Sequence, residues 1–445
     1  MIDTLKPYPQ YKESNLAWLG RIPSHWQLER TKQLFRLRTT KAPAKNGLEL
    51  LSIYTHIGVR PRKELEQRGN KASSTDGYWI VNAGDIIVNK LLAWMGAVGV
   101  SHYNGVTSPA YDVLKPVRSL EPDFYHHLFR TGTYLQQFKA RSRGIMEMRL
   151  RLYFDQLGQI PVPFPPRDEQ VAIVQFLNRI NTRLDRVIRA KRKELALISE
   201  MLSVVTQNAL QLEGTKRLRL SIVAEVMSRP IDRRTDRSYI PIGLYNRGRG
   251  IFHKATRDGA ELGDSDFFWV EDGDFVISGQ FAWEGAVALA RAKESGCVAS
   301  HRYPILRGRK EFVSSAVLFA LFRTSYGAML LDHNSRGAAG RNRPLNIERL
   351  LKETVPIPPI SAQAHITELL NKEFAVTQSL AETIQFINEY RDRLIGEVVT
   401  GKLDVRGIEL PALAEAEVVE DLVELEEMQT DEDAELIAEA TNADN

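Results

Sequence analysis

Two long segments carry apolar residues at three- and four-residue steps, the spacing of an amphipathic helix. The first begins near Asp168, and the second runs from Ser361 to about Thr400, just before Gly401, a typical helix stop. Each helix would be about 60 Å long at 1.5 Å per residue, too long to bury its apolar face inside one ordinary domain. The pattern therefore predicts that the two helices pair as a coiled coil; the alternative is that each packs only on its own domain.

The remaining apolar residues fall mostly in short runs bounded by glycine, asparagine or aspartate, which is typical of strands. Such runs occur at Tyr78–Val81, Asp85–Val88 and Asp274–Ile277. The stretches 123–140 and 313–331 instead have the spacing of short helices. This mixture predicts α+β domains with irregular sheets.

The chain also contains an internal duplication at an offset near 190 residues. Residues 84–98 (GDIIVNKLLAWMGAV) and 273–287 (GDFVISGQFAWEGAV) are identical at seven of fifteen positions, where chance gives about one. Further pairs follow in the same order: FRTGTY and FRTSY, Arg143-Gly144 and Arg336-Gly337, IPVPFPP and VPIPP, Gln170 and Gln363. Two copies of a whole domain, each followed by one long helix, explain this order.

We therefore predict an α+β protein in which two pseudo-twofold-related α/β domains are separated by two long antiparallel helices that form a coiled coil. The predicted parts are a first domain at 1–166, a first helix at 167–213, a second domain at 214–359, a second helix at 360–403 and an acidic tail at 404–445.

Charge is distributed unevenly along the chain. The net charge is +3, but the segment from Asp404 to Asn445 has 15 acidic residues and one basic residue, which leaves +17 on residues 1–403. A body this basic favours a polyanionic partner, and the tail is interpreted as a solvated appendage. The hydrophobic content of 43% is ordinary, and no apolar run is long enough to span a membrane, so the cytoplasm is the expected location.

Sequence motifs of several enzyme classes are absent. The chain has no P-loop, no Rossmann glycine fingerprint, no HExxH zinc motif and no Asn-Pro-Pro-Tyr or Asp-Pro-Pro-Tyr string of the amino-methyltransferases. His126 and His127 are adjacent on a predicted helix, so they cannot share one metal-binding face. Cys297, the single cysteine, excludes an intrachain disulfide, has no histidine at a diagnostic spacing and is expected to be buried. The sequence therefore predicts a chain without a catalytic site, metal or cofactor.

Basic residues gather at 139–151, 229–257 and 336–349, and the first and last of these occupy equivalent places in the two copies. Guanidinium groups bind phosphates and guanine edges, so a matched pair of basic loops favours nucleic acid, although one such loop alone is usually just solvated surface. Polar residues just before the two AW(M/E)GAV strings could reach base edges. The candidate DNA-binding residues are Asn89, Lys90, Lys139, Arg141, Arg143, Arg149, Arg151, Arg247, Arg249, Gln280, Arg336, Arg341, Asn342 and Arg343.

Two further features each allow two interpretations. Trp94 and Trp283 are either platforms for base stacking or core residues at a strand end. The arginines and lysines between Arg179 and Lys193 form either a solvated helix face or a contact with DNA phosphates or an acidic partner.

The order and duplication of several strings resemble the specificity (S) subunits of type I restriction-modification systems. The similarity covers nearly all of residues 10–407, without the acidic tail, and the second copy departs from the first at Ala362, where the first has Glu169. The strings are YKESNLAWLGRIPSHWQLER at 11–30, GDIIVNKLLAWMGAV, SPAYDVLKP, IPVPFPPRDEQVAIVQFL at 160–177, VPIPPISAQAHITELL at 355–370 and RLIGEVVTGKLDVRG at 393–407.

The resemblance implies two target-recognition domains, each of which reads one half of a split double-stranded DNA target. It also implies two modification subunits, which carry S-adenosylmethionine and the adenine methyltransferase chemistry, and restriction subunits, which use ATP and Mg. This chain would then be the non-catalytic recognition subunit and would hold no cofactor itself. Two alternatives stay open: a DNA-binding nuclease or methyltransferase with a degenerate site, and a protein-only scaffold that binds acidic proteins.

Overall fold

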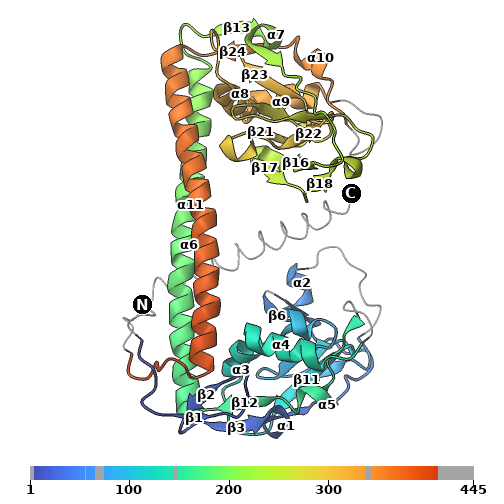
Figure 1. Ribbon diagram of the computed structural model, residues 1–445, viewed down its shortest axis with the longest axis vertical. Coiled ribbons are helices and arrows are strands. Elements are labelled where there is room, and N and C mark those ends of the chain that lie inside the picture. The colour runs from blue at the N-terminus through green and yellow to red at the C-terminus, as the bar shows by residue number, and fades with distance from the viewer. Residues whose placement is uncertain (1–4, 56, 66–74, 145–148, 336–342, 409–445) are drawn as a thin grey trace. The chain divides into compact units, whose positions relative to one another are not determined.

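The structure is a computed structural model that describes residues 5–55, 57–65, 75–144, 149–335 and 343–408 (Figure 1). The chain divides into two compact units, each of which includes part of both long helices. Unit 1 comprises Met1–Ile188 and Thr383–Asn445, and unit 2 comprises Arg189–Glu382. The predicted acidic tail lies outside the described residues from position 409 onward.

Unit 1 contains a four-stranded antiparallel sheet in which β8 is central and both of its faces are covered. Ile86 and Val88 face the main core of the unit, whereas Ile87 faces a second apolar cluster. This alternation follows from the two-residue period of a strand. The sheet order is β4 (Phe35–Leu37), β11 (Tyr111–Pro116), β8 (Ile86–Asn89) and β9 (Val98–Val100).

Unit 2 repeats this sheet with the same strand order. Phe275 and Ile277 face its main core, and Val276 faces a separate cluster that includes Cys297. The equivalent order is β14 (Ala224–Val226), β23 (Ile305–Gly308), β20 (Phe275–Ile277) and β21 (Val287–Leu289). The duplication inferred from sequence is therefore a duplication of the fold.

Two-stranded antiparallel sheets and short helices complete both units. In unit 1 the pairs are β1 (Tyr11–Glu13) with β2 (Arg21–Pro23), β3 (Gln27–Arg30) with β12 (Pro161–Phe164), β5 (Leu51–Tyr54) with β6 (Gly58–Pro61), and β7 (Trp79–Val81) with β10 (Gly105–Thr107). In unit 2 they are β13 (Lys216–Arg219) with β24 (Thr354–Ile357), β15 (Ser238–Tyr239) with β18 (Arg257–Asp258), β16 (Ile242–Leu244) with β17 (Ile251–His253), and β19 (Phe267–Trp269) with β22 (Val298–Ser300). The short helices are α1 (Thr31–Leu34), α2 (Arg62–Leu65), α5 (Phe154–Leu157), α7 (Leu220–Val223) and α10 (Ile347–Leu350).

Each of the two predicted helical stretches forms a pair of helices that is broken at a threonine. The pairs are α3 (Pro122–Phe129) with α4 (Gly132–Arg141), and α8 (Ser315–Phe322) with α9 (Ser325–His333). Thr324 begins α9, since its hydroxyl accepts a hydrogen bond from the Gly327 N–H at 3.3 Å. Both threonine hydroxyls also donate to the carbonyl three residues earlier, Thr131 to Leu128 at 2.8 Å and Thr324 to Leu321 at 2.6 Å, which satisfies an open carbonyl at the end of each first helix.

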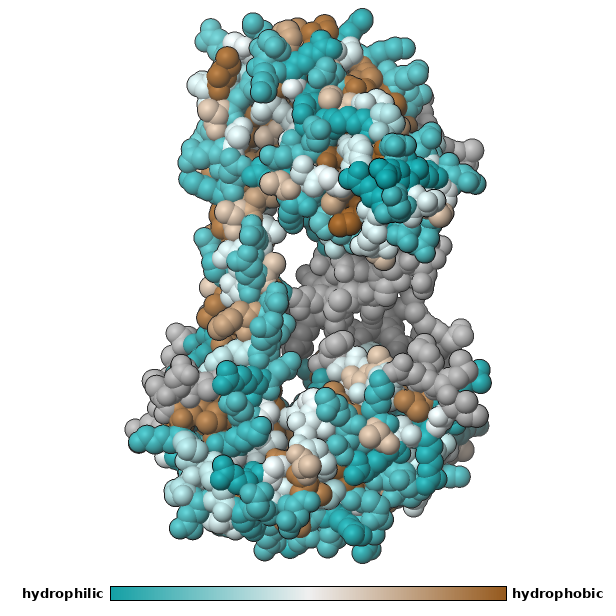
Figure 2. Space-filling model, in the orientation of Figure 1, coloured by the Kyte–Doolittle hydropathy of each residue, from teal (hydrophilic) through white to brown (hydrophobic). Residues whose placement is uncertain are grey.

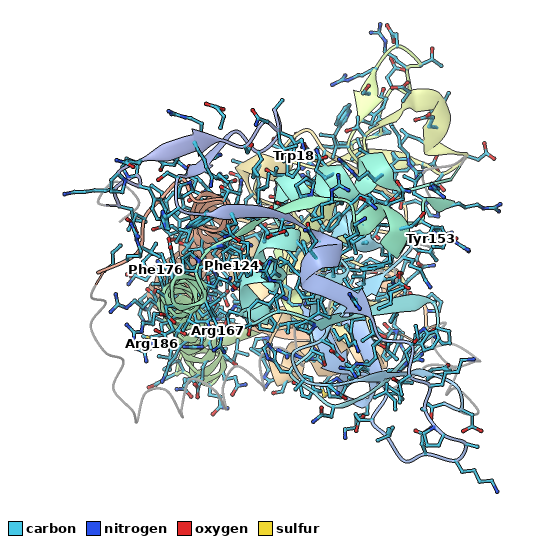
Figure 3. The ribbon with its side chains drawn as sticks, turned by 90° about the horizontal axis from the view of Figure 1, so that it is seen from below. Trp18, Phe124, Tyr153, Arg167, Phe176 and Arg186 are labelled. Atoms are coloured by element: carbon cyan, nitrogen blue, oxygen red, sulfur yellow. The ribbon has the colours of Figure 1, made fainter. Side chains whose placement is uncertain are left out.

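The two long helices, α6 (Arg167–Ala209) and α11 (Ile360–Val399), pack against each other in both units (Figures 1 and 3). In unit 1 the Arg391 guanidinium contacts the Asp185 carboxylate, and in unit 2 Lys191 Nζ donates to Ser379 Oγ at 3.2 Å. As residue numbers rise along α6, those of the partners on α11 fall, so the pairing is antiparallel. The predicted helix pair is thus confirmed. No helix of the described residues is long and apolar enough to cross a membrane.

The beginning of α6 holds the N-terminal segment of unit 1 through Glu169. The buried carboxylate of Glu169 accepts hydrogen bonds from Tyr8 Oη at 2.6 Å and Trp26 Nε1 at 3.0 Å, and it lies 2.8 Å from His25 Nε2. Burial and the adjacent carboxylate raise the pKa of Tyr8, so its hydroxyl remains a donor. In unit 2 the equivalent position is Ala362, which has no such acceptor.

Candidate nucleic-acid interface

Each unit has a short loop after its central strand, which we call the tip loop: residues 90–95 in unit 1 and 279–284 in unit 2. A 3-10 helix forms the second half of each loop, η2 (Ala93–Met95) and η6 (Ala282–Glu284). Both 3-10 helices end at a glycine with positive φ, +100° at Gly96 and +71° at Gly285, a conformation that other residues rarely adopt. This local chemistry gives the two tip loops the same shape.

The basic segment of each copy is joined to the tip loop of its own unit by a backbone hydrogen bond. In unit 1 the backbones of Arg143 and Arg151 pair with each other at 2.9 Å, and the next N–H, of Leu152, donates to Lys90 O at 2.8 Å. In unit 2 Ser335 pairs with Leu345, whose N–H donates to Gly279 O at 2.8 Å. We use the name basic hairpins for residues 143–151 and 335–345, of which the structure describes only the paired ends, 143–144 with 149–151 and Ser335 with 343–345. Two regions that the sequence nominated separately therefore lie together in each unit.

A cation lies over the indole ring in both tip loops. Lys139 Nζ is 4.8 Å from the ring centre of Trp94, and the Arg343 guanidinium is 5.0 Å from that of Trp283. Both rings are half-buried, and neither Nε1 has a hydrogen-bond partner among the described residues. Because a cation already covers a ring face, the arrangement favours a structural role for the tryptophans, in which they position a basic side chain beside the tip loop.

Unit 2 has a third element at this surface, the loop 245–250 with the 3-10 helix η4 (Asn246–Gly248). The Gly248 N–H donates to Gly285 O at 2.8 Å, and the Asn246 amide donates to the Glu284 carboxylate, so the loop is bonded to the tip loop. Arg247 has φ +58°, an uncommon conformation for a residue with a side chain, which often marks a functional position. The exposed Arg247 and Arg249 therefore flank the tip loop of unit 2.

The chain has a recognisable family relationship over its first domain. Residues 23–197 match the family described as "Type I restriction modification DNA specificity domain". Residues 23–197 are thus similar to a type I DNA specificity domain. This match confirms the resemblance inferred from the sequence over those residues.

One solved structure shows that the overall fold is shared over most of the chain. A structure described as "Structural basis underlying complex assembly and conformational transition of the type I R-M system" matches with a TM-score of 0.53 at 16% identity, over 86% of this chain and 99% of that one. An HsdS subunit from Thermoanaerobacter tengcongensis matches with a TM-score of 0.43 at 17% identity, over 88% and 100% of the two chains. A comparison with curated proteins finds no significant match.

Most of the candidate DNA-binding residues of the specificity domain and its repeat are accessible. Lys139, Arg143, Arg149, Arg151, Arg247, Arg249 and Gln280 are exposed, and Arg141 and Arg343 are half-buried. Arg143 lies 3.3 Å from the Asp155 carboxylate, a solvated pair that leaves its guanidinium available. Arg336, Arg341 and Asn342 lie outside the described residues.

Two candidates are engaged within unit 1. Asn89 is buried, and its side-chain oxygen accepts a hydrogen bond from the Leu91 N–H at 3.1 Å, which shapes the tip loop. Lys90 Nζ donates to Pro109 O at 3.0 Å and lies 3.4 Å from the Asp112 carboxylate. Burial raises the pKa of Asp112, although the lysine opposes that shift. Asn89 is therefore too buried for base contact, whereas the half-buried Lys90 is held by Pro109 and Asp112.

Sequence reasoning missed the exposed apolar side chains of the tip loops. Leu91, Leu92 and Met95 in unit 1, and Phe281 in unit 2, are 38%, 40%, 51% and 41% exposed. The visible surface of both units is otherwise largely hydrophilic, with apolar residues in separate patches (Figure 2). The signal was present in the aligned strings KLLAWM and GQFAWE, but a run of apolar residues beside a strand is usually assigned to the core.

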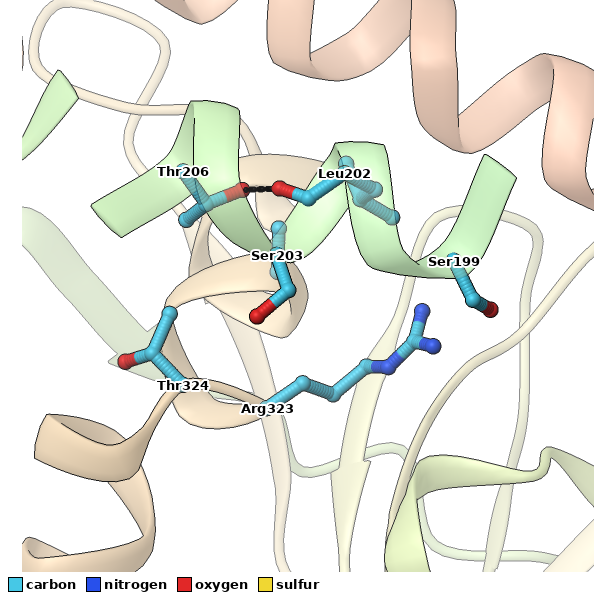
Figure 4. A pocket seen from close by; sticks show the side chains of 7 residues that line it. Ser199, Leu202, Ser203, Thr206, Arg323 and Thr324 are labelled. Atoms are coloured by element: carbon cyan, nitrogen blue, oxygen red, sulfur yellow. Dashed lines mark hydrogen bonds between the residues drawn. The ribbon is translucent and has the colours of Figure 1, made fainter. Parts of the chain in front are cut away.

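A small cavity of about 60 Å³ lies in unit 2 beside Arg323 (Figure 4). The Arg323 guanidinium forms a bidentate ion pair with Glu373 at 2.6 and 2.8 Å, so its charge is already neutralised. The volume corresponds to about two water molecules, well below that of a typical ligand site. The lining residues are Ser199, Leu202, Ser203, Thr206, Ala320, Arg323 and Thr324.

Cys297 is buried, as the sequence predicts, and its Sγ lies 3.7 Å from His253 Nε2, a neighbour that the sequence did not reveal. Burial, together with the nearby Glu294, raises the pKa of the thiol, which keeps it protonated and weakly nucleophilic. Over the described residues, no cluster of three or more His, Cys, Asp or Glu side chains could hold a metal ion.

Proposed function

We propose that this chain is the specificity subunit of a type I restriction-modification complex and that it recognises a bipartite DNA target, one half with each unit. The observation that carries the proposal is the recurrence, in both units, of a basic hairpin bonded to a tip loop. Two copies of one DNA-reading device suit a target that is read in two halves. A single-site enzyme would not need this duplication.

Binding is proposed to combine two kinds of contact. Exposed arginines of the hairpins, together with Lys139 beside the tip loop of unit 1, neutralise phosphates, which gives affinity that falls steeply with salt concentration. A smaller number of side chains from the tip loops and hairpins contact base edges, and each good bidentate contact supplies about 1–3 kcal/mol of discrimination. The net charge of +17 on the body of the chain, without its acidic tail, supports the first contribution.

The paired helices α6 and α11 are proposed to set the separation of the two half-sites. Each helical residue adds about 1.5 Å, so the length of the pair would fix the number of base pairs between the halves. Deletion of one turn, four residues, from both helices should shift the spacer in the methylated sequence. An unchanged spacer, read by methylation sequencing of a host that carries the altered system, would refute this role.

The chemistry is assigned to partner subunits. Two modification subunits would carry S-adenosylmethionine and transfer the methyl group to adenine, and restriction subunits would use ATP and Mg. The neighbouring structure of a type I assembly supports such partners for this fold. In this scheme the chain binds, positions and spaces the DNA, and it contributes no catalytic group of its own.

The direct test is DNA binding by the chain assembled with modification subunits. Arg143→Ala and Arg336→Ala should each weaken binding and reduce its salt dependence, whereas Lys12→Ala, an exposed cation on β1, should do neither. Wild-type affinity in both arginine variants would remove the hairpins from the interface. Methyl transfer by the isolated chain with labelled cofactor would favour the enzyme alternative, and failure to bind DNA at low salt would favour a protein-only scaffold.

A further inference from the structure

We infer that the exposed apolar side chains of the tip loops, above all Leu92 and Phe281, lie in the major groove and read thymine methyl groups. This inference rests on the proposed function and deepens it, since it assigns base recognition to residues that the charge pattern did not point to.

The two residues occupy the same place in the two copies. Leu92 and Phe281 each stand immediately before a fully buried alanine, Ala93 or Ala282, at the beginning of the 3-10 helix. The strand before each loop is buried, so the loop is the point where apolar side chains emerge at the surface. The residue type differs between the copies, but the apolar character and the exposure of about 40% are shared. Such a match is unexpected for side chains that merely happen to be exposed.

The surroundings of the tip loops are suited to DNA rather than to an apolar protein surface. The basic hairpin is bonded to the loop in both units, and Lys139 or Arg343 lies over the adjacent tryptophan. The centres of protein–protein interfaces are depleted of charged residues. In the major groove, by contrast, phosphates surround the base edges, and the thymine C5-methyl is the apolar group that those edges present. Apolar side chains framed by cations match that chemistry.

The two loops should differ in what they read. Unit 1 exposes Leu91, Leu92 and Met95, whereas unit 2 exposes Gln280 and Phe281 and pairs Glu284 with Asn246. Glutamine binds adenine through N6 and N7. Unit 1 is therefore expected to depend more strongly on thymine methyl groups, and unit 2 to combine one methyl contact with an amide contact.

The test uses the assembled complex and a duplex that carries its methylated sequence, identified by sequencing the methylated DNA of a host. A second duplex has deoxyuridine in place of each thymine of the target, which removes only the methyl groups. Wild-type complex should bind the uridine duplex more weakly, by about fourfold for each thymine methyl group that a tip loop covers. Leu92→Ala and Phe281→Ala should weaken binding to the thymine duplex and bring the thymine-to-uridine ratio toward one for their own half-site.

Val117→Ala and Ile222→Ala are the matched controls, because each side chain is 42% exposed in the same units but lies outside the tip loops. Both should keep the wild-type ratio, and thermal melting should show all four variants folded. Equal wild-type affinity for the two duplexes, or an unaltered ratio in the tip-loop variants, would overturn the inference and leave the proposed function standing. Loss of the modification subunits from Leu92→Ala with an unaltered ratio would identify the loop as a protein contact. A wild-type complex that binds neither duplex would overturn both proposals.

Discussion

Units 1 and 2 share a sheet order and a proposed DNA-binding surface, yet they are fixed to the long helices by different contacts. In unit 1 the first turn of α6 carries Glu169, which binds Tyr8, His25 and Trp26 of the N-terminal segment. In unit 2 the first turn of α11 carries Ala362 instead. The glutamines that follow, Gln170 and Gln363, hydrogen-bond the preceding proline-rich strands in the same way.

A second difference concerns one arginine at the end of the helix before each threonine break. Arg130 in unit 1 donates to the carbonyls of Thr55 at 2.6 Å and Gly96 at 2.7 Å, so it braces the loops themselves. Arg323 in unit 2 pairs with Glu373 of α11 and passes beneath Gly248. Arg130 therefore hydrogen-bonds the loops and has Asp392 of α11 as a nearby charge, whereas Arg323 forms a direct ion pair with α11.

These differences show what a duplicated reading domain must preserve. The features kept in both units are the sheet, the tip loop and its bond to the basic hairpin, all of which shape the proposed DNA-binding surface. The contacts that hold that surface to the rest of the protein can differ between the two units. Any set of contacts that gives each buried polar group a hydrogen-bond partner can keep the unit folded. The two anchoring contacts should therefore be separable by mutation.

The largest effect is expected for Glu169→Ala, which removes the partner shared by the buried Tyr8 and Trp26 and the more exposed His25. We expect a loss of about 3–5 kcal/mol in the stability of unit 1 and little change in unit 2. Hydrogen exchange read by mass spectrometry resolves the two units. Gln170→Ala and Gln363→Ala serve as the matched pair and should cost similar amounts in their own units. Equal loss of protection in both units after Glu169→Ala would show that the anchor is not specific to unit 1.

Arg323→Met should have the next largest effect, about 3 kcal/mol, because it leaves the Glu373 carboxylate buried without its cation. Burial raises the pKa of Glu373, but the hydrogen bonds and charge of Arg323 outweigh it and hold that pKa below its ordinary value. Arg130→Met should loosen the backbone at Thr55 and disturb α11 less than Arg323→Met does. Urea unfolding and exchange at α11 distinguish these outcomes. An identical exchange pattern for the two variants would contradict the proposed difference in anchoring.

Acid should destabilise unit 1 more than unit 2. Burial lowers the pKa of His127 to about 4 and that of His126 well below its ordinary value, while unit 2 has Phe319 and Ala320 at these positions. Because the folded-state pKa lies below that of the unfolded chain, the unfolded state binds the proton first, and stability falls as pH drops from about 6.5 toward 4. For His127 the loss at pH 5 should be about 2 kcal/mol. Urea unfolding at pH 7 and pH 5 measures this loss of stability. In the His127→Ala variant, the stability should depend less on pH.

The smallest effects on stability are expected in the basic hairpins. Arg143 makes an exposed ion pair, so Arg143→Ala should change stability by less than about 0.5 kcal/mol. Arg343 pairs with Asp332 at 2.7 Å and lies over Trp283, so Arg343→Ala should cost about 1 kcal/mol. Thermal unfolding checks both, and DNA affinity should fall in each variant. If Arg143→Ala lowered stability by more than this amount, the hairpin of unit 1 would contribute to the folding of the unit and not only to the proposed DNA-binding surface.

Much of the architecture could be predicted because its signals are local. The helical period predicted α6 and α11 to within a few residues, and Gly401 ends the second helix with φ +77°, in close contact with Pro23. The identities between 84–98 and 273–287 marked equivalent strands and tip loops. The breaks at Thr131 and Thr324 were harder to predict, since one threonine interrupts an apolar pattern that otherwise continues.

The sequence predicted which charged residues belong to the candidate DNA-binding surface, but it did not predict how they are arranged. The basic hairpins were nominated from composition, but the sequence gives no indication that Leu152 bonds to Lys90 some sixty residues earlier. Asn89 and Lys90 look accessible in a polar loop, yet folding buries Asn89 and engages Lys90 with Pro109 and Asp112. Leu92 and Phe281 look like core residues, yet the 3-10 helix that follows each of them leaves them at the surface.

The sequence by itself determined the duplication, the two amphipathic helices and the basic character of the body, because periodicity, identity and charge are properties of neighbouring residues. Only the tertiary structure decided which of those residues share a surface and which support it from within. Whether a residue reaches the surface depends on backbone hydrogen bonds and packing between segments far apart in the chain. At the tip loop of unit 1, neighbouring residues such as Asn89 and Leu92 differ in this respect, so one is structural and the other is a candidate contact.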